Sequence, residues 1–132
     1  MSRYCLDTSA YSHFKRGAEG VVEILDRAEW VGVPTVVLGE LRTGFLLGRR
    51  RGRNEADLKD FLANPVVESL VVDEEVSRHY AEIVCDLRRS GSPVPTNDIW
   101  IAATAARVGA LVLTYDSHFE KISRVGSLVL HR

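Results

Sequence analysis

The chain has 132 residues, 45% of them hydrophobic and 27% charged, which is the composition of one globular domain and not of a disordered or fibrous protein. Its formal charge of −1 argues against nucleic-acid binding through bulk charge alone. Cys5 and Cys85 form no CxxC pattern, so free thiols are expected and a zinc site is not. No signal peptide and no membrane-spanning stretch is visible. We therefore expect a cytoplasmic protein with a single domain over residues 1–132.

The periodicity of apolar residues switches repeatedly between strand and helix along the chain. Short apolar runs predict strands at 3–6, 30–33, 69–72, 110–114 and 127–130. Helical spacing predicts helices at 9–15 (capped by Thr8 or Ser9), 19–27, 35–47 (capped by Thr35), 54–62, from Asp73 towards Gly91, and 98–108 (capped by Thr96 or Asn97), with a short turn at 116–122. Strands that alternate with helices and read as continuous apolar runs predict an α/β sandwich around a mostly parallel sheet.

Four carboxylates stand at positions where an open parallel sheet places its ligands. Asp7 follows the first predicted strand and Asp116 follows the fourth, so both would lie at one edge of the sheet if these strands are neighbours. Asp98 begins a helix, and Glu40 lies on the apolar face of its helix, where an unpaired carboxylate is costly. No lysine is adjacent to these acids and no Cys/His set competes with them. Such a cluster needs a hard cation, and oxygen-only ligands favour Mg²⁺ or Mn²⁺.

Each acid also has a purely structural interpretation. The helix dipole alone favours Asp98 in a first turn, while Asp7 would cap the following helix and Asp116 would form an Asx turn. Glu40 would be an exposed residue paired with Arg42 or Arg49. The occurrence of all four acids together favours the metal site. The sequence contains none of the patterns GxxxxGK[ST], GxGxxG, GxSxG or HExxH, so nucleotide-binding, serine-hydrolase and zinc-protease sites are not indicated.

One basic segment and one histidine remain to be interpreted. No acid occurs between Leu41 and Asn54, a stretch that includes five arginines: Arg42, Arg49, Arg50, Arg51 and Arg53. This run, placed between the helices at 35–47 and 54–62, is either a solvated loop or a patch that contacts phosphates. His118, two positions after Asp116, is the histidine nearest the proposed site, where an auxiliary role stays open.

Four segments carry a resemblance to a known family. They are Leu-Asp-Thr-Ser at 6–9, Leu-Gly-Glu-Leu at 38–41, Pro-Thr-Asn-Asp-Ile-Trp-Ile-Ala-Ala at 95–103 and Leu-Thr-Tyr-Asp-Ser-His-Phe at 113–119. In order and spacing they resemble the signature stretches of PIN domains, in particular the VapC-type ribonuclease toxins of bacterial toxin–antitoxin pairs. The resemblance runs along the whole chain and implies a PIN-like three-layer α/β/α sandwich.

The resemblance also implies an activity and its residues. It identifies Asp7, Glu40, Asp98 and Asp116 with the catalytic acidic quartet that holds one or two Mg²⁺ or Mn²⁺ ions in PIN nucleases. It assigns the orientation of those acids, or of bound water, to small polar residues at four positions: Thr8, Ser9, Asn97 and Thr114. His118 stands where some relatives carry a further acid. The implied function is a metal-dependent endoribonuclease toxin that hydrolyses phosphodiester bonds in structured RNA, tRNA or rRNA, and so inhibits translation.

The partners implied by the resemblance are a cognate VapB-type antitoxin, whose C-terminal segment covers the active site, and a second copy of the chain in a homodimer. A higher-order complex would bind operator DNA through the antitoxin, with no membrane involved. The alternatives are a housekeeping PIN nuclease in RNA processing, a receiver-like domain and a binding module without catalysis. A receiver needs paired acids near the first strand and a lysine soon after the fourth, whereas this chain has Asp7 alone and Lys121.

Overall fold

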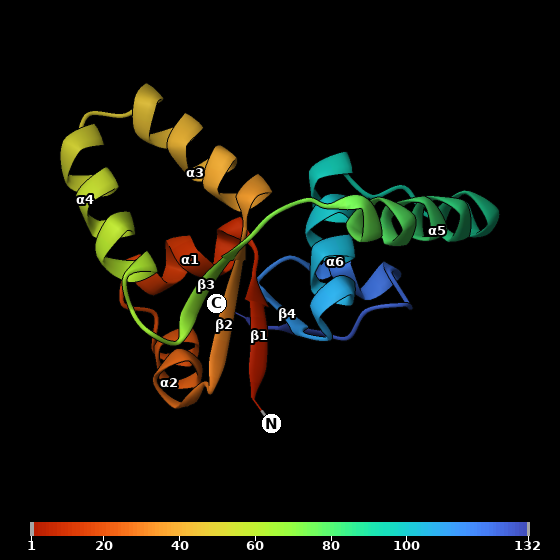
Figure 1. Cartoon of the computed structure of the whole chain (residues 1–132), viewed down its shortest axis with the longest axis horizontal. Helices are drawn as coiled ribbons and strands as arrows, with labels where there is room; N and C mark the ends of the chain where they lie inside the picture. Colours follow the sequence, from red (N-terminus) through yellow and green to blue (C-terminus); the bar gives the residue numbers. More distant parts are fainter. Residues whose placement is uncertain (1, 132) are drawn as a thin grey trace.

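A parallel sheet of five strands lies at the centre of the structure, a computed structural model that describes residues 2–131 (Figure 1). The strands are β1 (Arg3–Leu6), β2 (Trp30–Pro34), β3 (Val67–Leu70), β4 (Leu111–Thr114) and β5 (Ser127–Val129). They are arranged in the order β3-β2-β1-β4-β5, and every described pairing is parallel. Because helices cover both faces of such a sheet, its inner strands are apolar on both sides, which explains the continuous apolar runs in the sequence.

Helices form a layer on each side of this sheet. They are α1 (Thr8–Lys15), α2 (Glu19–Arg27), α3 (Thr35–Leu47), α4 (Arg51–Leu62), α5 (Glu74–Ser90) and α6 (Thr96–Val108), with a short 3₁₀ helix η1 (Ser117–Lys121) after β4. Figure 1 shows α1 and α2 on one side and α5 and α6 on the other, while α3 and α4 form a helical hairpin at the upper left. The predicted three-layer α/β/α sandwich is confirmed.

The strand order places a topological switch point between β1 and β4. The chain runs outward from β1 through β2 to β3, then crosses back to β4 on the other side of β1. In open parallel sheets ligands bind outside the carboxyl ends of the strands at such a point. Asp7 directly follows β1, and its backbone N–H donates to the carbonyl of Leu113 at 3.3 Å. The expected condition, that the strands before Asp7 and Asp116 are neighbours, is therefore met.

The start of α1 confirms the structural interpretation of Asp7 as a helix cap, and the expected cap at Thr8 or Ser9 is wrong. Its N-cap is Asp7, whose side chain accepts a hydrogen bond from the backbone N–H of Ala10 at 2.9 Å. Thr8 and Ser9 already belong to the first helical turn, so their hydroxyls lie too far along the helix to cap it. Both hydroxyls are free for other partners as a result.

The starts of α3 and α6 also differ from the prediction. Each begins directly after a proline, Pro34 or Pro95, and neither helix has a side-chain cap. Thr35 and Thr96 are the first residues of the helices rather than their caps. By contrast, Asp73 caps α5 as expected, accepting from the backbone N–H of Val76 at 2.9 Å.

Two further element boundaries were placed wrongly. The helix expected from residue 54 begins at Arg51, because arginine has a high helix propensity; only Arg49 and Arg50 of the basic run lie between α3 and α4. The third strand occupies Val67–Leu70, two residues before the expected position, and Val71 and Val72 are 66% and 41% exposed. Because the apolar run continues beyond the strand, the sequence alone does not indicate where the strand ends.

The apolar core lies between the sheet and the inner faces of the helices. Ala102, Ala103 and Ala105 on α6 are completely buried, and such small side chains let a helix approach the sheet closely. Cys5 is buried, Cys85 is exposed, and both thiols are free, as expected. None of the helices in residues 2–131 has the length and apolar character required to cross a bilayer.

Candidate active site

Asp7 is a buried carboxylate at the carboxyl end of β1. Asp7 is only 4% exposed. It accepts hydrogen bonds from the backbone N–H of Ala10 at 2.9 Å, from Ser9 Oγ at 2.8 Å and from Thr114 Oγ1 at 2.5 Å. These donors come from the start of α1 and the end of β4, so both elements fix the orientation of this carboxylate.

The two hydroxyls that bind Asp7 are themselves oriented by the backbone. Ser9 Oγ accepts from the N–H of Tyr115 at 3.0 Å, and Thr114 Oγ1 accepts from the N–H of Asp116 at 2.8 Å. Because each hydroxyl accepts a bond from the backbone, its own proton is available to Asp7. Ser9 and Thr114, to which the resemblance gives an orienting role, thus both lie next to Asp7.

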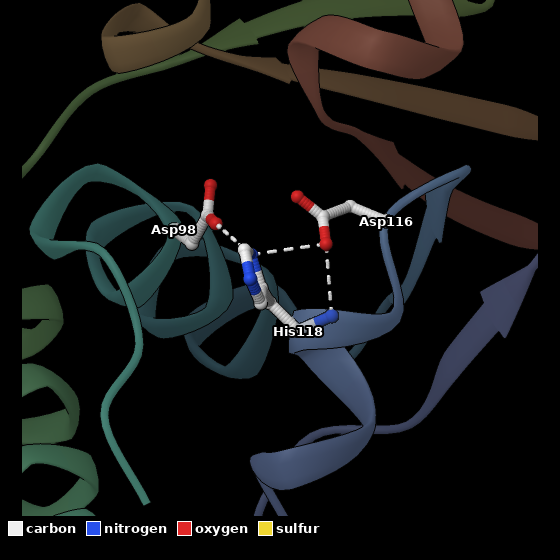
Figure 2. Close-up of side chains that lie close together, drawn as sticks. All are labelled: Asp98, Asp116 and His118. Carbon is white, nitrogen blue, oxygen red and sulfur yellow. Dashed lines mark hydrogen bonds and ion pairs between the residues drawn. The ribbon is translucent and has the colours of Figure 1, made fainter.

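Asp98 and Asp116 lie on opposite sides of an imidazole ring (Figure 2). Asp98 comes from the first turn of α6, and Asp116 caps η1 by accepting from the backbone N–H of His118 at 2.9 Å. His118 Nδ1 is 3.4 Å from Asp98 Oδ2 and 3.0 Å from Asp116 Oδ1. One ligand atom from each of the three residues lies within 4.8 Å of the other two. Asp116 therefore forms the expected Asx turn, and its carboxylate also belongs to the cluster of Asp98, Asp116 and His118.

The charges of three carboxylates act on one another. Burial, and after it the charges of Asp116 and Asp7, raise the pKa of Asp98 to about 6, while His118 opposes the shift. Burial also raises the pKa of Asp7 above its usual range, against the hydrogen bonds that it accepts. A cation placed among these groups would favour their charged forms.

Glu40 is held at the edge of this cluster by two side chains. Thr8 Oγ1 donates to Glu40 Oε1 at 2.6 Å, and Asn97 Nδ2 donates to Oε2 at 3.4 Å. Both donors are sequence neighbours of cluster acids, so they link α3 to the site. The alternative pairing of Glu40 with Arg42 is wrong, because Arg42 Nε pairs with Glu55 at 3.0 Å.

The donor set fits a divalent cation. Among residues 2–131, no lysine or arginine forms an ion pair with any of the four acids. The nitrogen His118 Nδ1 is buried, yet it has no aligned hydrogen-bond partner in this part of the chain. Clustered carboxylates without a countercharge repel one another, and oxygen ligands of this kind suit Mg²⁺ or Mn²⁺.

The basic run is only partly gathered in one place. Arg50 and Arg53 line a cavity of about 380 Å³ between α1, α3 and α4, together with Lys15 and Arg16 from the end of α1. Arg42 is held in its ion pair on the surface of α3. The sequence prediction missed the contribution of α1, although two adjacent cations at the end of a helix were its signal. The remaining two arginines, Arg49 and Arg51, are exposed and, like Arg42, do not line the cavity.

Comparison with known proteins places this geometry in a family. The family model of the PIN domain matches residues 4–125 of this chain. Ribonuclease VapC4 of Mycobacterium tuberculosis is 41% identical over 91 residues, 69% of each chain. Ribonuclease VapC5 of the same organism is 32% identical over 130 residues, 96% of this chain and 93% of the relative. The chain belongs to the PIN-domain family, in its VapC group. This PIN domain also matches the structure of DNA-bound VapBC from Salmonella typhimurium with a TM-score of 0.85, 27% identity, and coverage of 97% and 98% of the two chains.

Proposed function

We propose that this VapC-type PIN domain is an endoribonuclease dependent on Mg²⁺ or Mn²⁺, with Asp7, Glu40, Asp98 and Asp116 as its active-site acids. The observation that carries the proposal is the convergence of carboxylates at the switch point of the sheet without a lysine or arginine to neutralise them, in residues 2–131. A site of this composition suits phosphodiester hydrolysis assisted by a hard cation. The VapC ribonucleases that the chain resembles support the same reaction.

The residues of the site divide the work of hydrolysis. When bound, the metal acts as a Lewis acid that favours deprotonation of water and offsets charge at the phosphate. Asp98 and Asp116 hold that cation, and Asp7 is kept in position by the hydroxyls of Ser9 and Thr114. Both oxygens of Glu40 accept hydrogen bonds, so its carboxylate is fixed beside the cluster, where we assign it to orient the attacking water.

Charge explains how an acidic site attracts RNA. The chain has 17 basic and 18 acidic residues, and without the four active-site acids the remaining charge is 17 − 14 = +3. Cation binding therefore removes the local repulsion of phosphates, and RNA affinity should depend on the metal. We assign the first phosphate contacts to the cations around the cavity between α1, α3 and α4: Lys15, Arg16, Arg50 and Arg53. Arg42, Arg49 and Arg51 would add contacts outside it.

The proposed biological role is that of a toxin controlled by a partner protein. The Salmonella typhimurium relative was captured as DNA-bound VapBC. We propose a corresponding assembly here, in which a VapB-type antitoxin binds this chain and carries it to operator DNA. A homodimer and a tRNA or rRNA substrate remain predictions. A housekeeping PIN nuclease would use the same chemistry, but its expression would not arrest growth and no cognate antitoxin would neutralise it.

The receiver-like alternative does not agree with the sheet. Receiver domains have the strand order 2-1-3-4-5, whereas this sheet has the order β3-β2-β1-β4-β5. The acids of this chain also come from β1, α3, α6 and the turn after β4, rather than from a pair near the first strand. Acetyl phosphate should therefore leave the protein unlabelled.

Cleavage of total cellular RNA by antitoxin-free protein tests the proposed activity. We expect discrete fragments with Mg²⁺ or Mn²⁺, no fragments with excess chelator, and no fragments from Asp7→Asn or Asp98→Asn. Asp26→Asn is the matched control, because Asp26 is an exposed acid on α2, and it should cleave like wild type. Cleavage in excess chelator, or full activity of Asp98→Asn, would overturn the proposal.

A further inference from the structure

The turn after β4 determines where His118 lies. Asp116 caps η1 and accepts a hydrogen bond from the backbone N–H of His118 at 2.9 Å. This Asx turn brings the residue two positions later back towards the capping carboxylate. The spacing Asp-x-His therefore places an imidazole beside Asp116, and α6 supplies Asp98 on the other side of the ring (Figure 2).

The Nδ1 edge of this ring faces the interior of the site. The side chain of His118 is 42% exposed, yet its Nδ1 atom is buried and has no aligned hydrogen-bond partner within the described chain. The exposed part of the ring must therefore be its other edge, which includes Nε2. Nδ1 is 3.0 Å from Asp116 Oδ1 and 3.4 Å from Asp98 Oδ2, but neither oxygen lies along the direction of a ring N–H.

A buried nitrogen between two carboxylate oxygens needs a partner. As a donor, Nδ1 is poorly aligned with both oxygens. As an acceptor, its lone pair faces two negative groups, and burial of an unsatisfied polar atom is unfavourable. A cation bound among the three atoms, all within 4.8 Å of one another, would satisfy the lone pair and both carboxylates together. Neutral imidazole with its proton on Nε2 is the form that binds metals through Nδ1.

We propose that His118 binds the divalent cation directly through Nδ1, and that this nitrogen makes the site prefer a transition metal such as Mn²⁺ to Mg²⁺. The proposal rests on the metal centre of the proposed function and deepens it. Mg²⁺ requires near-ideal octahedral oxygen coordination and keeps several waters. Imidazole nitrogen suits transition metals better than it suits Mg²⁺. One nitrogen among carboxylates therefore shifts the balance between the two ions without changing the shape of the site.

The structure also indicates which substitutions test this role. His118→Asp restores an all-oxygen donor set at the same position, while His118→Ala removes the ligand. Both changes remove the close contacts of Nδ1 with Asp98 and Asp116. Neither removes an aligned hydrogen bond of Nδ1, and the bond to Asp116 Oδ1 comes from the backbone N–H. His131→Ala is the matched control, since His131 is an exposed histidine outside the cluster. Far-UV circular dichroism should be used to verify that each variant is folded.

Pulsed electron paramagnetic resonance of Mn²⁺-loaded protein reads the ligand directly. We expect ¹⁴N coupling from a bound imidazole in wild type and in His131→Ala, and none in His118→Ala or His118→Asp. Calorimetric titration should show that wild type binds Mn²⁺ more tightly than Mg²⁺. The ratio of the two affinities should fall by about tenfold in His118→Asp, a loss of the order seen when metal sites are altered.

These measurements need no RNA, so they separate the two proposals. Bound Mn²⁺ without ¹⁴N coupling, or an unchanged Mn²⁺/Mg²⁺ ratio in both His118 variants, overturns the role of His118. Metal-dependent RNA cleavage would in that case leave the proposed function intact. If wild type shows the ¹⁴N coupling but cleaves no RNA, the ligand assignment is supported and the nuclease proposal fails.

Discussion

Thr8 and Glu40 are 32 positions apart in the sequence, yet the hydroxyl of Thr8 donates a 2.6 Å hydrogen bond to Glu40 Oε1. Thr8 is the first residue of α1, directly after Asp7, and Glu40 lies in the middle of α3. This bond therefore fixes a carboxylate of α3 relative to the end of β1. The other oxygen of Glu40 is held from α6 by Asn97.

Thr8→Val should slow RNA cleavage without unfolding the protein. Valine keeps the shape of threonine but removes the donor, so Glu40 loses its fixed orientation, and misplacement of a group that orients a reactant is costly. We expect the rate to fall by roughly tenfold to a hundredfold, with Mn²⁺ affinity nearly unchanged. Thr43→Val on α3, the helix of Glu40, is the control, since the hydroxyl of Thr43 donates to the carbonyl of Gly39 and not to Glu40. An equal loss in both variants would argue against a positioning role for Thr8.

Removal of a charge from the cluster should stabilise the metal-free protein. The pKa of Asp98 is raised to about 6 by burial and by Asp116 and Asp7, so the folded state binds its proton more tightly than the unfolded state does. This contribution to stability is fully present below pH 4 and is lost as the pH rises through 6. In chelator at pH 7, Asp98→Asn should be more stable than wild type by up to about 3 kcal/mol.

Urea denaturation between pH 4 and pH 7 measures this difference. The advantage of Asp98→Asn should shrink towards pH 4, where Asp98 is protonated in the folded protein. Saturating Mn²⁺ should reverse the order, because binding to the native state stabilises wild type. Asp26→Asn on the exposed surface of α2 should match wild type throughout. A variant less stable than wild type in chelator at pH 7 would contradict the account of the cluster.

The sheet beneath the site depends on a glycine in β2. A Cβ added at Gly32 would lie 2.5 Å from Trp30 Cη2 and 2.6 Å from Leu70 Cδ1. Gly32→Ala should therefore lower the free energy of unfolding by about 1–3 kcal/mol, the usual cost of overpacking. Gly44→Ala on α3, where the added Cβ meets nothing within 4 Å besides its chain neighbours and the adjacent backbone of its own helix, should raise it by about 1 kcal/mol. Thermal denaturation should rank the variants in this order, and a harmless Gly32→Ala would show that β2 is less tightly packed.

Arg53 should contribute to the salt dependence of RNA binding. It lines the cavity between α1, α3 and α4, and each phosphate contact adds about one to the slope of log affinity against log salt. Arg53→Ala should reduce this slope by about one, measured in a Glu40→Gln background that prevents cleavage. Arg27→Ala should leave it unchanged, because Arg27, the last residue of α2, is not among the residues that line this cavity. Equal salt slopes for Arg53→Ala and Arg27→Ala would indicate that the cavity binds a ligand other than RNA.

The positions of Asp7 and Asp116 were predictable because they depend on local signals and one rule of topology. Each acid follows an apolar run, and the carboxyl ends of neighbouring parallel strands meet at one edge. The partner of Glu40 was not predictable, since the bond from Thr8 depends on how α3 packs beside α1. Lys15 and Arg16 are visible in the sequence as two adjacent cations, but their position beside Arg50 and Arg53 depends on how α1 packs against α3 and α4.

The predicted ends of helices and strands were wrong where the sequence is compatible with two positions for the same boundary. Valines lie near both ends of β3, so the sequence is compatible with a strand at 67–70 or at 69–72. Only the pairing with β2 selects Val67–Leu70. The arginine run was divided wrongly because a basic segment is compatible with a loop or with a helix. His118 was left open, because its role depends on the direction of Nδ1, which the fold determines.

Anomalous diffraction from crystals grown with Mn²⁺ tests the central claim most directly, since it locates the cation independently of activity. We predict one strong peak at coordination distance from Asp98 and Asp116, on the side of the site that faces Asp7. The peak should disappear in Asp98→Asn crystals grown at the same Mn²⁺ concentration. A protein that needs Mn²⁺ for RNA cleavage but binds it elsewhere, with no peak between these carboxylates, would contradict the account.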